Sequence, residues 1–198
     1  MPNAPLSRRE RDYQGSLRAA ARGLWSGEEG FFNFLDAATR SIEHNFTMAW
    51  YEGLADCGIS PSEQTPDEEA RLRMEINLEI GYLYQFAWDI SSNNKYNGGK
   101  LSTIFNRLDM WVNKYGMIRG LARTYACEDE KLMWVMMPLK EHCRDCLRLD
   151  GKVYRRSTWR KYNIYPRMPN LECGGYHCGC DLVPTSEPLS RGRPIGRF

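Results

Sequence analysis

Apolar side chains recur at helical spacing over most of the first 130 residues, on four successive stretches at about 7–25, 31–57, 66–90 and 101–125. The last stretch is the most regular. From Leu101 to Tyr125 the apolar positions follow one another at alternating steps of three and four residues, which is the spacing of helices that pack against neighbours in a bundle. We therefore predict a short amphipathic arm followed by three long helices.

The predicted helix ends carry residues that satisfy unpaired backbone groups. Thr65 is placed to cap a helix, Pro66 suits its first turn, and Glu68 stands three residues after the cap, as in a capping box. Gly58 suits the end of the preceding helix. The stretch SSNNKYNGGK, at residues 91–100, ends the third helix with asparagines and glycines.

The pattern changes after residue 130. KLMWVMMP, GKVYRRSTW and CDLVP are short and rich in β-branched or aromatic residues, so each predicts a strand. The final stretch, TSEPLSRGRPIGRF, has little to bury and predicts an extended tail that orders on a partner. The predicted fold is mainly α: a helical arm and long-helix bundle (1–130), a small β-rich zinc-binding module without a core of its own (131–184) and an extended basic tail (185–198).

Charge is distributed unevenly along the chain. The formal net charge is +2, but residues 1–150 carry 18 Lys and Arg against 22 Asp and Glu, whereas residues 151–198 carry 9 against 3. A basic segment of this kind is typical of contact with nucleic acid or another polyanion. The same positive charges could instead neutralise a group of cysteine thiolates, and both explanations of the basic segment stay open.

Neither a membrane span nor a signal peptide is predicted. No apolar run reaches the roughly 18 residues that a span needs, and MPNAPLSRRERDYQG lacks the apolar stretch of a signal peptide. We therefore expect a soluble protein made in a reducing compartment. In that setting clustered cysteines favour metal binding or redox chemistry over structural disulfides.

Five of the seven cysteines form two short clusters, Cys143 with Cys146, and Cys173 with Cys178 and Cys180. Zn²⁺ takes four ligands in a tetrahedron, and two cysteines spaced as C-x2-C can direct both sulfurs to one point. The preferred ligand set is Cys143, Cys146, Cys173 and Cys178, with Cys180 as the substitute for either of the last two. Glycines 174, 175 and 179 let the backbone fold closely around an ion.

A shell made only of cysteines has no open position for water, so the predicted zinc site is structural. His142 and His177 are further nitrogen donors, although the adjacent cysteines make them redundant. Disulfides between the two clusters stay an open alternative, since an oxidising location is compatible with the sequence.

Enzymatic interpretations lack the residues they need. A thioredoxin-like role for CRDC would need a βαβ pattern around it. A zinc deaminase would need H-x-E and P-C-x-x-C, and neither motif occurs. A metal-dependent nuclease would have to use His44, His142 or His177, and the last two stand next to cysteines, so a nuclease stays open only as the weaker alternative. We therefore predict a protein that is not an enzyme.

The stretches HCRDCLRLDGKVYRRSTW and YPRMPNLECGGYHCGCDLVPTSEP resemble the C-terminal cysteine module of tailed-phage head-morphogenesis proteins, also called minor head or minor capsid proteins. The resemblance covers about residues 138–184. One departure is that CGGYH stands where the family has His-Pro-Asn before its final C-x-C, so that Cys173 would replace a histidine ligand. This leaves the assignment between Cys173 and Cys180 open.

The resemblance implies a virion structural protein of low copy number, made in the host cytoplasm and acting near the portal in head assembly. Its implied partners are the portal protein or the major capsid protein, with contact to packaged DNA left open and no membrane involved. The alternative is a zinc-ribbon protein that binds nucleic acid through its basic segment.

Overall fold

The computed structural model divides the chain into two compact units, which are described one at a time. The helical unit comprises residues 6–48 and 69–115, and the described residues of the cysteine-bearing unit lie within 49–68 and 116–194. The predicted β module, residues 131–184, belongs to the second unit together with the ends of three helices, and its boundaries as a separate domain stay a prediction. The residues that the structure describes are 6–127, 129–137, 142–175 and 179–194.

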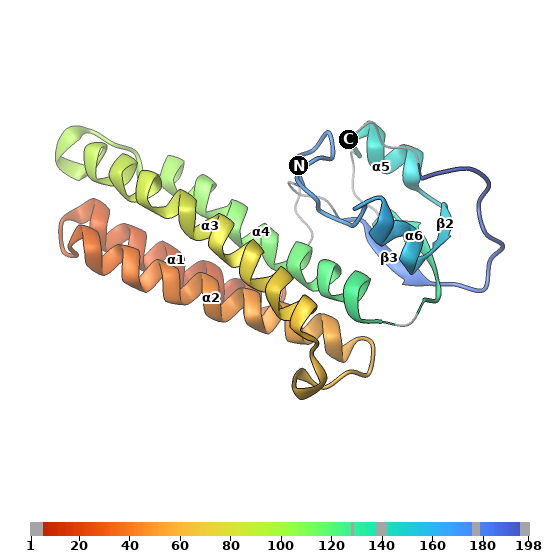
Figure 1. Cartoon of the computed structure of the whole chain (residues 1–198). Coiled ribbons are helices and arrows are strands. Elements are labelled where there is room, and N and C mark those ends of the chain that lie inside the picture. Colours follow the sequence, from red (N-terminus) through yellow and green to blue (C-terminus); the bar gives the residue numbers. More distant parts are fainter. Residues whose placement is uncertain (1–5, 128, 138–141, 176–178, 195–198) are drawn as a thin grey trace. The chain divides into compact units, whose positions relative to one another are not determined.

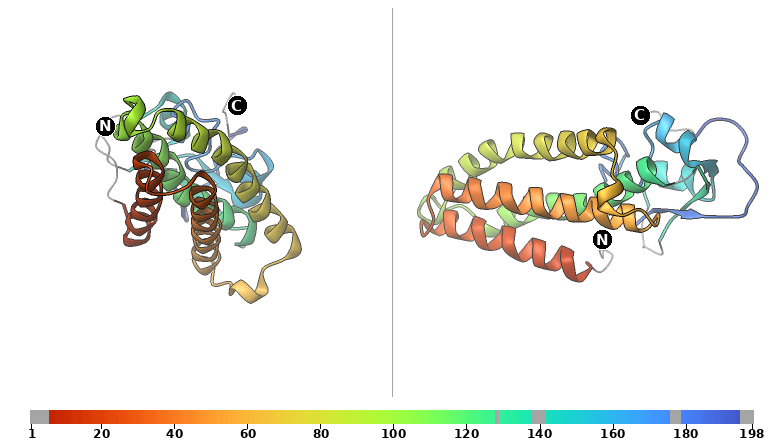
Figure 2. Two further views of the ribbon diagram at one scale, coloured as in Figure 1. Left: turned by 90° about the vertical axis from the view of Figure 1, so that its left-hand side faces the viewer. Right: turned by 60° about the horizontal axis from the view of Figure 1, so that its bottom comes forward.

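All four predicted helices are present, as α1 (Arg8–Ser26), α2 (Phe31–Ala55), α3 (Pro66–Ser92) and α4 (Leu101–Ala126). Short 3₁₀ turns, η1 (Pro61–Glu63) and η2 (Lys95–Asn97), lie on either side of α3. Within the helical unit the four helices run side by side (Figures 1 and 2). None of the helices in the described ranges combines the length and apolar character needed to cross a bilayer.

The core of the helical unit is formed by the predicted apolar faces. Phe86 lies at its centre, with its ring centroid 6.1 Å from that of Phe34 and 5.1 Å from that of Trp111. In the first turn of α2 the buried aromatic is Phe34, whereas the predicted Phe31 and Leu35 are only partly covered. Burying a side chain of this size contributes roughly 1.5–3 kcal/mol. Other buried members are Tyr13, Leu17, Ile42, Phe46, Leu83, Ile90 and Leu108.

The helix ends are capped by side chains. The predicted capping box at α3 is confirmed, since the backbone N–H of Thr65 donates to Glu68 Oε2 at 2.8 Å and that of Glu68 donates to Thr65 Oγ1 at 3.4 Å. A second capping box, formed by Ser7 and Glu10, begins α1. Each satisfies backbone donors that a helix start would otherwise leave unpaired.

The cysteine-bearing unit contains a three-stranded antiparallel sheet with the order β2-β1-β3. Its strands are β1 (Lys131–Val135), β2 (Val153–Arg155) and β3 (Asp181–Pro184), and two short helices, α5 (Arg144–Leu149) and α6 (Arg156–Lys161), complete it. The first and third strands match the prediction. The second was predicted too long, because the chain leaves the sheet after Arg155 and RRSTWRK forms α6.

The expectation that this module lacks a core is wrong. Trp134 on β1 and Trp159 on α6 are both 0% exposed, with ring centroids 5.9 Å apart. Trp159 Nε1 donates to the Leu132 carbonyl at 3.2 Å, and Tyr154 packs edge-on against the same ring at 5.1 Å. Because β2 passes directly into α6, Trp159 packs against the sheet and gives the module an aromatic core.

The described part of the C-terminal tail, residues 185–194, has no regular secondary structure, as predicted. It is nevertheless attached to the sheet. The Ser190 backbone N–H donates to the Val153 carbonyl at 2.8 Å, and the Val153 N–H donates to Ser190 Oγ at 3.0 Å. This part of the tail is therefore held by the chain itself rather than by a partner.

Candidate metal centre

Three of the five clustered cysteines meet in the cysteine-bearing unit. The sulfurs of Cys143, Cys146 and Cys173 all lie within 4.8 Å of one another. Cys146 is buried, whereas Cys143 and Cys173 are partly exposed. Two distant segments of the chain therefore bring thiols to one place, and this group can hold a metal ion.

The first two cysteines are positioned by the start of α5. Cys143 is the residue that caps this helix, with extended backbone angles, and its Sγ accepts a hydrogen bond from the Cys146 backbone N–H at 3.4 Å. The C-x2-C segment is thus the first turn of a helix rather than an isolated turn. Residues three apart in a helical turn lie on the same side of the helix, so Cys143 and Cys146 face the same way.

Cys173 is brought to this helix by its neighbour Glu172. The Glu172 carboxylate accepts from the Arg144 backbone N–H at 2.7 Å and from Arg144 Nε at 2.9 Å. In return the Glu172 backbone N–H donates to Asp145 Oδ2 at 2.8 Å. The Arg144 backbone N–H, and next its side chain, hold the pKa of Glu172 below its usual value. These reciprocal bonds fix the residue before Cys173 against the residues after Cys143.

The backbone after Cys173 requires glycine, as the sequence indicates. Gly174 has φ +60° and Gly175 has φ +76°, a region that residues with a Cβ rarely adopt. A Cβ on Gly175 would also collide with the carbonyl oxygen of Arg167. These glycines let the chain turn sharply beside the thiols.

The other predicted donors are placed differently. Cys180 is buried just before β3 but does not belong to the group of three sulfurs. His142 adjoins Cys143 and is likewise not a member of that group among the residues that were described. Cys178 and His177 lie outside the described residues.

The donor set fits zinc chemistry. Zn–S bonds of about 2.3 Å in a tetrahedron place sulfurs roughly 3.8 Å apart, so a spread within 4.8 Å needs only a small adjustment of side chains. Three sulfurs leave one position for a fourth ligand. Cys178 and Cys180 are the predicted residues for it.

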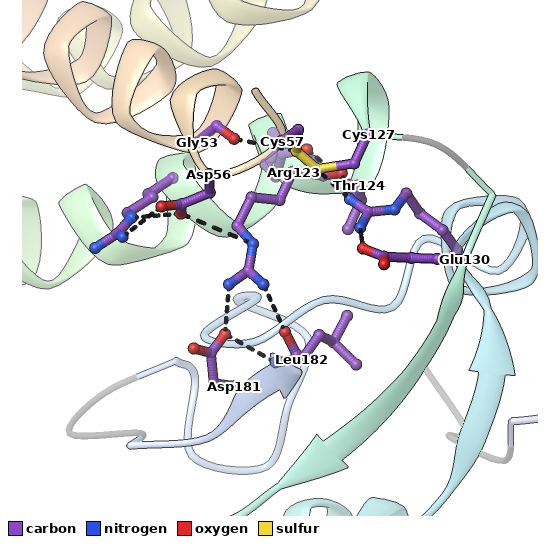
Figure 3. Close-up of a disulfide and its surroundings, with 12 residues drawn as sticks. Gly53, Asp56, Cys57, Arg123, Thr124, Cys127, Glu130, Asp181 and Leu182 are labelled. Atoms are coloured by element: carbon purple, nitrogen blue, oxygen red, sulfur yellow. Dashed lines mark hydrogen bonds and ion pairs between the residues drawn. A yellow bond between two sulfur atoms is a disulfide. The ribbon is translucent and has the colours of Figure 1, made fainter. Parts of the chain in front are cut away.

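The remaining two cysteines form a disulfide that no sequence motif predicts. Cys57, just after α2, is joined to Cys127, just after α4, across 70 residues of sequence, with their Cα atoms 5.0 Å apart (Figure 3). The only signal in the sequence is that each cysteine stands at the end of a predicted long helix. This bridge ties the two helix ends together within the cysteine-bearing unit.

A buried arginine lies beside the disulfide. Arg156 is 2% exposed, and its Nη2 bonds Glu130 Oε1 at 2.5 Å while its Nη1 donates to the Arg123 carbonyl. Burial lowers the pKa of Arg156, and the charge of Glu130 opposes that effect. The ion pair therefore compensates a cation that the fold removes from water.

Arg123 connects the end of α4 to the sheet (Figure 3). Its Nη2 donates to the Leu182 carbonyl at 2.9 Å, and its Nη1 bonds Asp181 Oδ1 at 3.3 Å. Asp56 in turn receives a two-bond contact from Arg119, at 2.8 and 2.9 Å. The arginines of this region thus serve structure, and sequence reasoning assigned them no such role.

No protein-family model, curated protein or solved structure matches the chain. The chemistry of the cysteine group is therefore the main support for a function. Three thiols on fixed backbone can bind a soft divalent ion, and with a cysteine as the fourth ligand no position stays open for substrate.

Proposed function

We propose that the protein is a structural protein of a tailed-phage head that acts near the portal during assembly, with a zinc ion fastening its cysteine-bearing unit. The observation that carries the proposal is the meeting of Cys143 and Cys146 with Cys173. The family resemblance in the sequence rests on the same cysteines, so the geometry supports it. Cys178 or Cys180 completes the ligand shell.

The proposed role is not catalytic. A closed shell of cysteines supplies folding free energy, about 10–16 kcal/mol in small zinc modules, and leaves no coordination site for chemistry. The protein would then act through its surfaces, in the virion, by contact with the portal protein or the major capsid protein. Zinc would keep α5 and the loop that bears Cys173 in one arrangement for that contact.

Elemental analysis of the purified protein tests the metal. We expect one zinc per chain without added metal. Cys146→Ser should lose the zinc, because this buried thiol is one of the three that can hold the ion. Cys178→Ser and Cys180→Ser identify the fourth ligand, since only one of them should lose the ion.

A double variant, Cys57→Ser with Cys127→Ser, is the matched control. It removes the two cysteines of the disulfide and leaves the cluster intact, so its zinc content should equal that of the unchanged protein. A metal-free unchanged protein, or full zinc in Cys146→Ser, would refute the zinc site.

The assembly role needs a separate test. If the encoding phage is grown without this protein, we expect heads that are defective in number or in DNA content. The protein should also be recovered in purified virions at low copy number. Normal, filled heads formed in its absence would contradict the role in assembly even if zinc were bound.

A second candidate function, binding of nucleic acid, is favoured by the exposed cations of the cysteine-bearing unit. Arg156 is occupied inside the fold, but several others reach solvent, namely Lys152, Arg155, Arg160, Lys161, Arg191 and Arg193. A DNA-binding protein that uses them would lose affinity steeply as salt rises. Absence of binding to duplex DNA at low salt would eliminate this candidate.

A further inference from the structure

Helix α3 exposes large apolar side chains on its outward side in addition to the apolar stripe that it buries. Two carboxylates, Glu75 and Glu79, point inward and are 8% and 5% exposed. Five large apolar side chains point outward and are 46–59% exposed, namely Met74, Leu78, Tyr82, Tyr84 and Trp88. Soluble monomers rarely expose an apolar patch of this extent without a use for it.

Both inward carboxylates are paired with cations of the helical unit. Glu75 forms an ion pair with Arg71 at 2.5 Å, and Glu79 forms one with Lys114. Glu75 and Glu79 are the only charged residues between positions 74 and 88. The outward side of this stretch therefore carries no formal charge.

The exposed patch continues onto the start of α2. The ring of Phe31 lies edge-on to Tyr84 at 5.3 Å and to Phe32 at 5.4 Å, and Phe32 is 77% exposed. We call this surface the aromatic face. It consists of Phe31, Phe32, Met74, Leu78, Tyr82, Tyr84 and Trp88.

We propose that the aromatic face binds the same face of a second copy of this chain, with the two α3 helices antiparallel and crossing at Gly81. Gly81 lies midway along the outward side and is exposed, and a Cβ there would have nothing within 4 Å. Two backbones can therefore approach closely at this point. An uncharged face meets its own copy without repulsion, and a twofold axis is the commonest symmetry of protein dimers.

The size of the face suits a modest dimer. Aromatic side chains bury roughly 150–250 Å² each, so about half of that from the five aromatic residues, with a smaller share from Met74 and Leu78, gives roughly 600 Å² per chain. A pair would bury on the order of 1,200 Å², at the lower end of specific interfaces. The dimer should therefore form reversibly as concentration rises.

The two ends of the aromatic face are flanked by ion pairs. Arg73 stands just before the uncharged stretch and Asp89 just after it. Arg73 contacts Glu69, and Asp89 accepts from Arg107 at 2.6 Å, with both pairs at the surface. Each end therefore carries one cation and one anion, so a second copy meets no net charge of its own sign at either end.

Sedimentation equilibrium of the full chain over a wide concentration range tests the proposal. We expect monomer at the lowest concentration and dimer at the highest. Leu78→Glu and Trp88→Glu each place a charge in the interface, and each should weaken the dimer by at least about 30-fold, as loss of a central contact does. Met110→Glu is the control, since Met110 is exposed on α4 but lies outside the aromatic face.

A crosslink tests the geometry. Gly81→Cys should form a disulfide-linked dimer under mild oxidation, because the twofold axis would place the two new thiols together. Gly15→Cys, at an open position on α1, should not form a linked dimer. Circular dichroism checks that each variant keeps its helices.

Three results would overturn the proposal. They are a protein that stays monomeric at every concentration, a dimer that Leu78→Glu and Trp88→Glu leave unchanged, and a monomer whose aromatic face instead binds a different protein. Zinc removal by a chelator should leave the dimer intact, because the aromatic face lies in the other unit. Absence of the dimer would therefore leave the zinc proposal standing, and absence of zinc would leave the dimer proposal standing.

Discussion

The two units reach an ordered structure in different ways. In the helical unit each helix carries a long apolar face, and many buried side chains share the stabilisation. In the cysteine-bearing unit the strands have three to five residues and the helices α5 and α6 have six each. Elements this short are not stable by themselves. That unit depends on a few specific contacts.

These contacts are of three kinds. The Trp134–Trp159 pair supplies the core, the disulfide and Arg156 hold the helix ends, and the cysteine group joins α5 to the loop before β3. When stabilisation rests on few groups, loss of one removes a large share of it. Single substitutions should therefore have larger effects in the cysteine-bearing unit than in the helical unit.

Among substitutions that leave every cysteine in place, the largest loss of stability is expected from Trp159→Ala. This side chain is fully buried between Trp134 and Tyr154 and donates a hydrogen bond to Leu132. Its removal should lower the free energy of unfolding of the cysteine-bearing unit by about 3–5 kcal/mol. Near-ultraviolet circular dichroism should show the loss of aromatic packing, while the far-ultraviolet helical signal stays largely unchanged.

The control removes an exposed aromatic from the other unit. Tyr96, in η2, is 77% exposed, so Tyr96→Ala should change stability by less than about 0.5 kcal/mol. If Trp159→Ala unfolded the whole chain in one transition, the two units would not be independent. If it had no effect, the tryptophan pair would not be the core of its unit.

The helices could be predicted from the sequence because their signal is repeated along each element. Apolar positions every three or four residues marked the buried faces, and the Thr65, Pro66 and Glu68 set located the start of α3 correctly. The aromatic face was not foreseen. Periodicity identified the inward stripe of α3, but it did not show that Glu75 and Glu79 would be inside and Trp88 outside.

The candidate site could be predicted in part because C-x2-C and the second cysteine cluster are local motifs. The contact that brings them together is not local, since the Glu172–Arg144 pair joins residues 28 apart. The disulfide, which joins residues 70 apart, is likewise not marked by any local motif. Trp159 was assigned to a strand for a similar reason. Its residue type favours a strand, whereas the pairing of β1 with β2 ends at Arg155 and frees the chain to form α6.

An intermediate effect is expected from Gly53→Ala in the cysteine-bearing unit. A Cβ on Gly53 of α2 would lie 2.6 Å from the Cβ of Ala122 and would collide with the Arg119 carbonyl of α4. Two helix backbones are in contact here, so neither can move aside cheaply. Chemical denaturation should show a loss of about 1–3 kcal/mol from overpacking.

Gly15→Ala makes the same change in α1 of the helical unit, where nothing lies within 4 Å of the new atom. There we expect a gain of about 0.5–1 kcal/mol, because alanine favours helix over glycine. A loss of stability at Gly53 and a gain at Gly15 would support the contrast between the units. A gain at both would mean that α2 and α4 are not in close contact at Gly53.

The smallest effect concerns the buried carboxylate Glu75 and depends on pH. Burial raises the pKa of Glu75, although Arg71 and Lys114 act against that shift. Its protonated form is therefore favoured in the folded protein, so Glu75 destabilises the helical unit above its raised pKa and ceases to do so as the pH falls through it. Glu75→Gln should accordingly stabilise this unit at neutral pH, by an amount that shrinks on acidification.

Asp129 in the cysteine-bearing unit serves as the comparison, because its pKa is shifted in the opposite direction. It accepts the Ser157 backbone N–H near the start of α6 at 2.8 Å, and this bond lowers the pKa of Asp129. Its stabilisation is present at neutral pH and is lost as the pH falls below the usual aspartate value. In thermal unfolding followed as a function of pH, Asp129→Asn should therefore lower stability at neutral pH where Glu75→Gln raises it. Equal pH profiles for the two variants would show that the ion pair with Arg71 outweighs burial and lowers the pKa of Glu75.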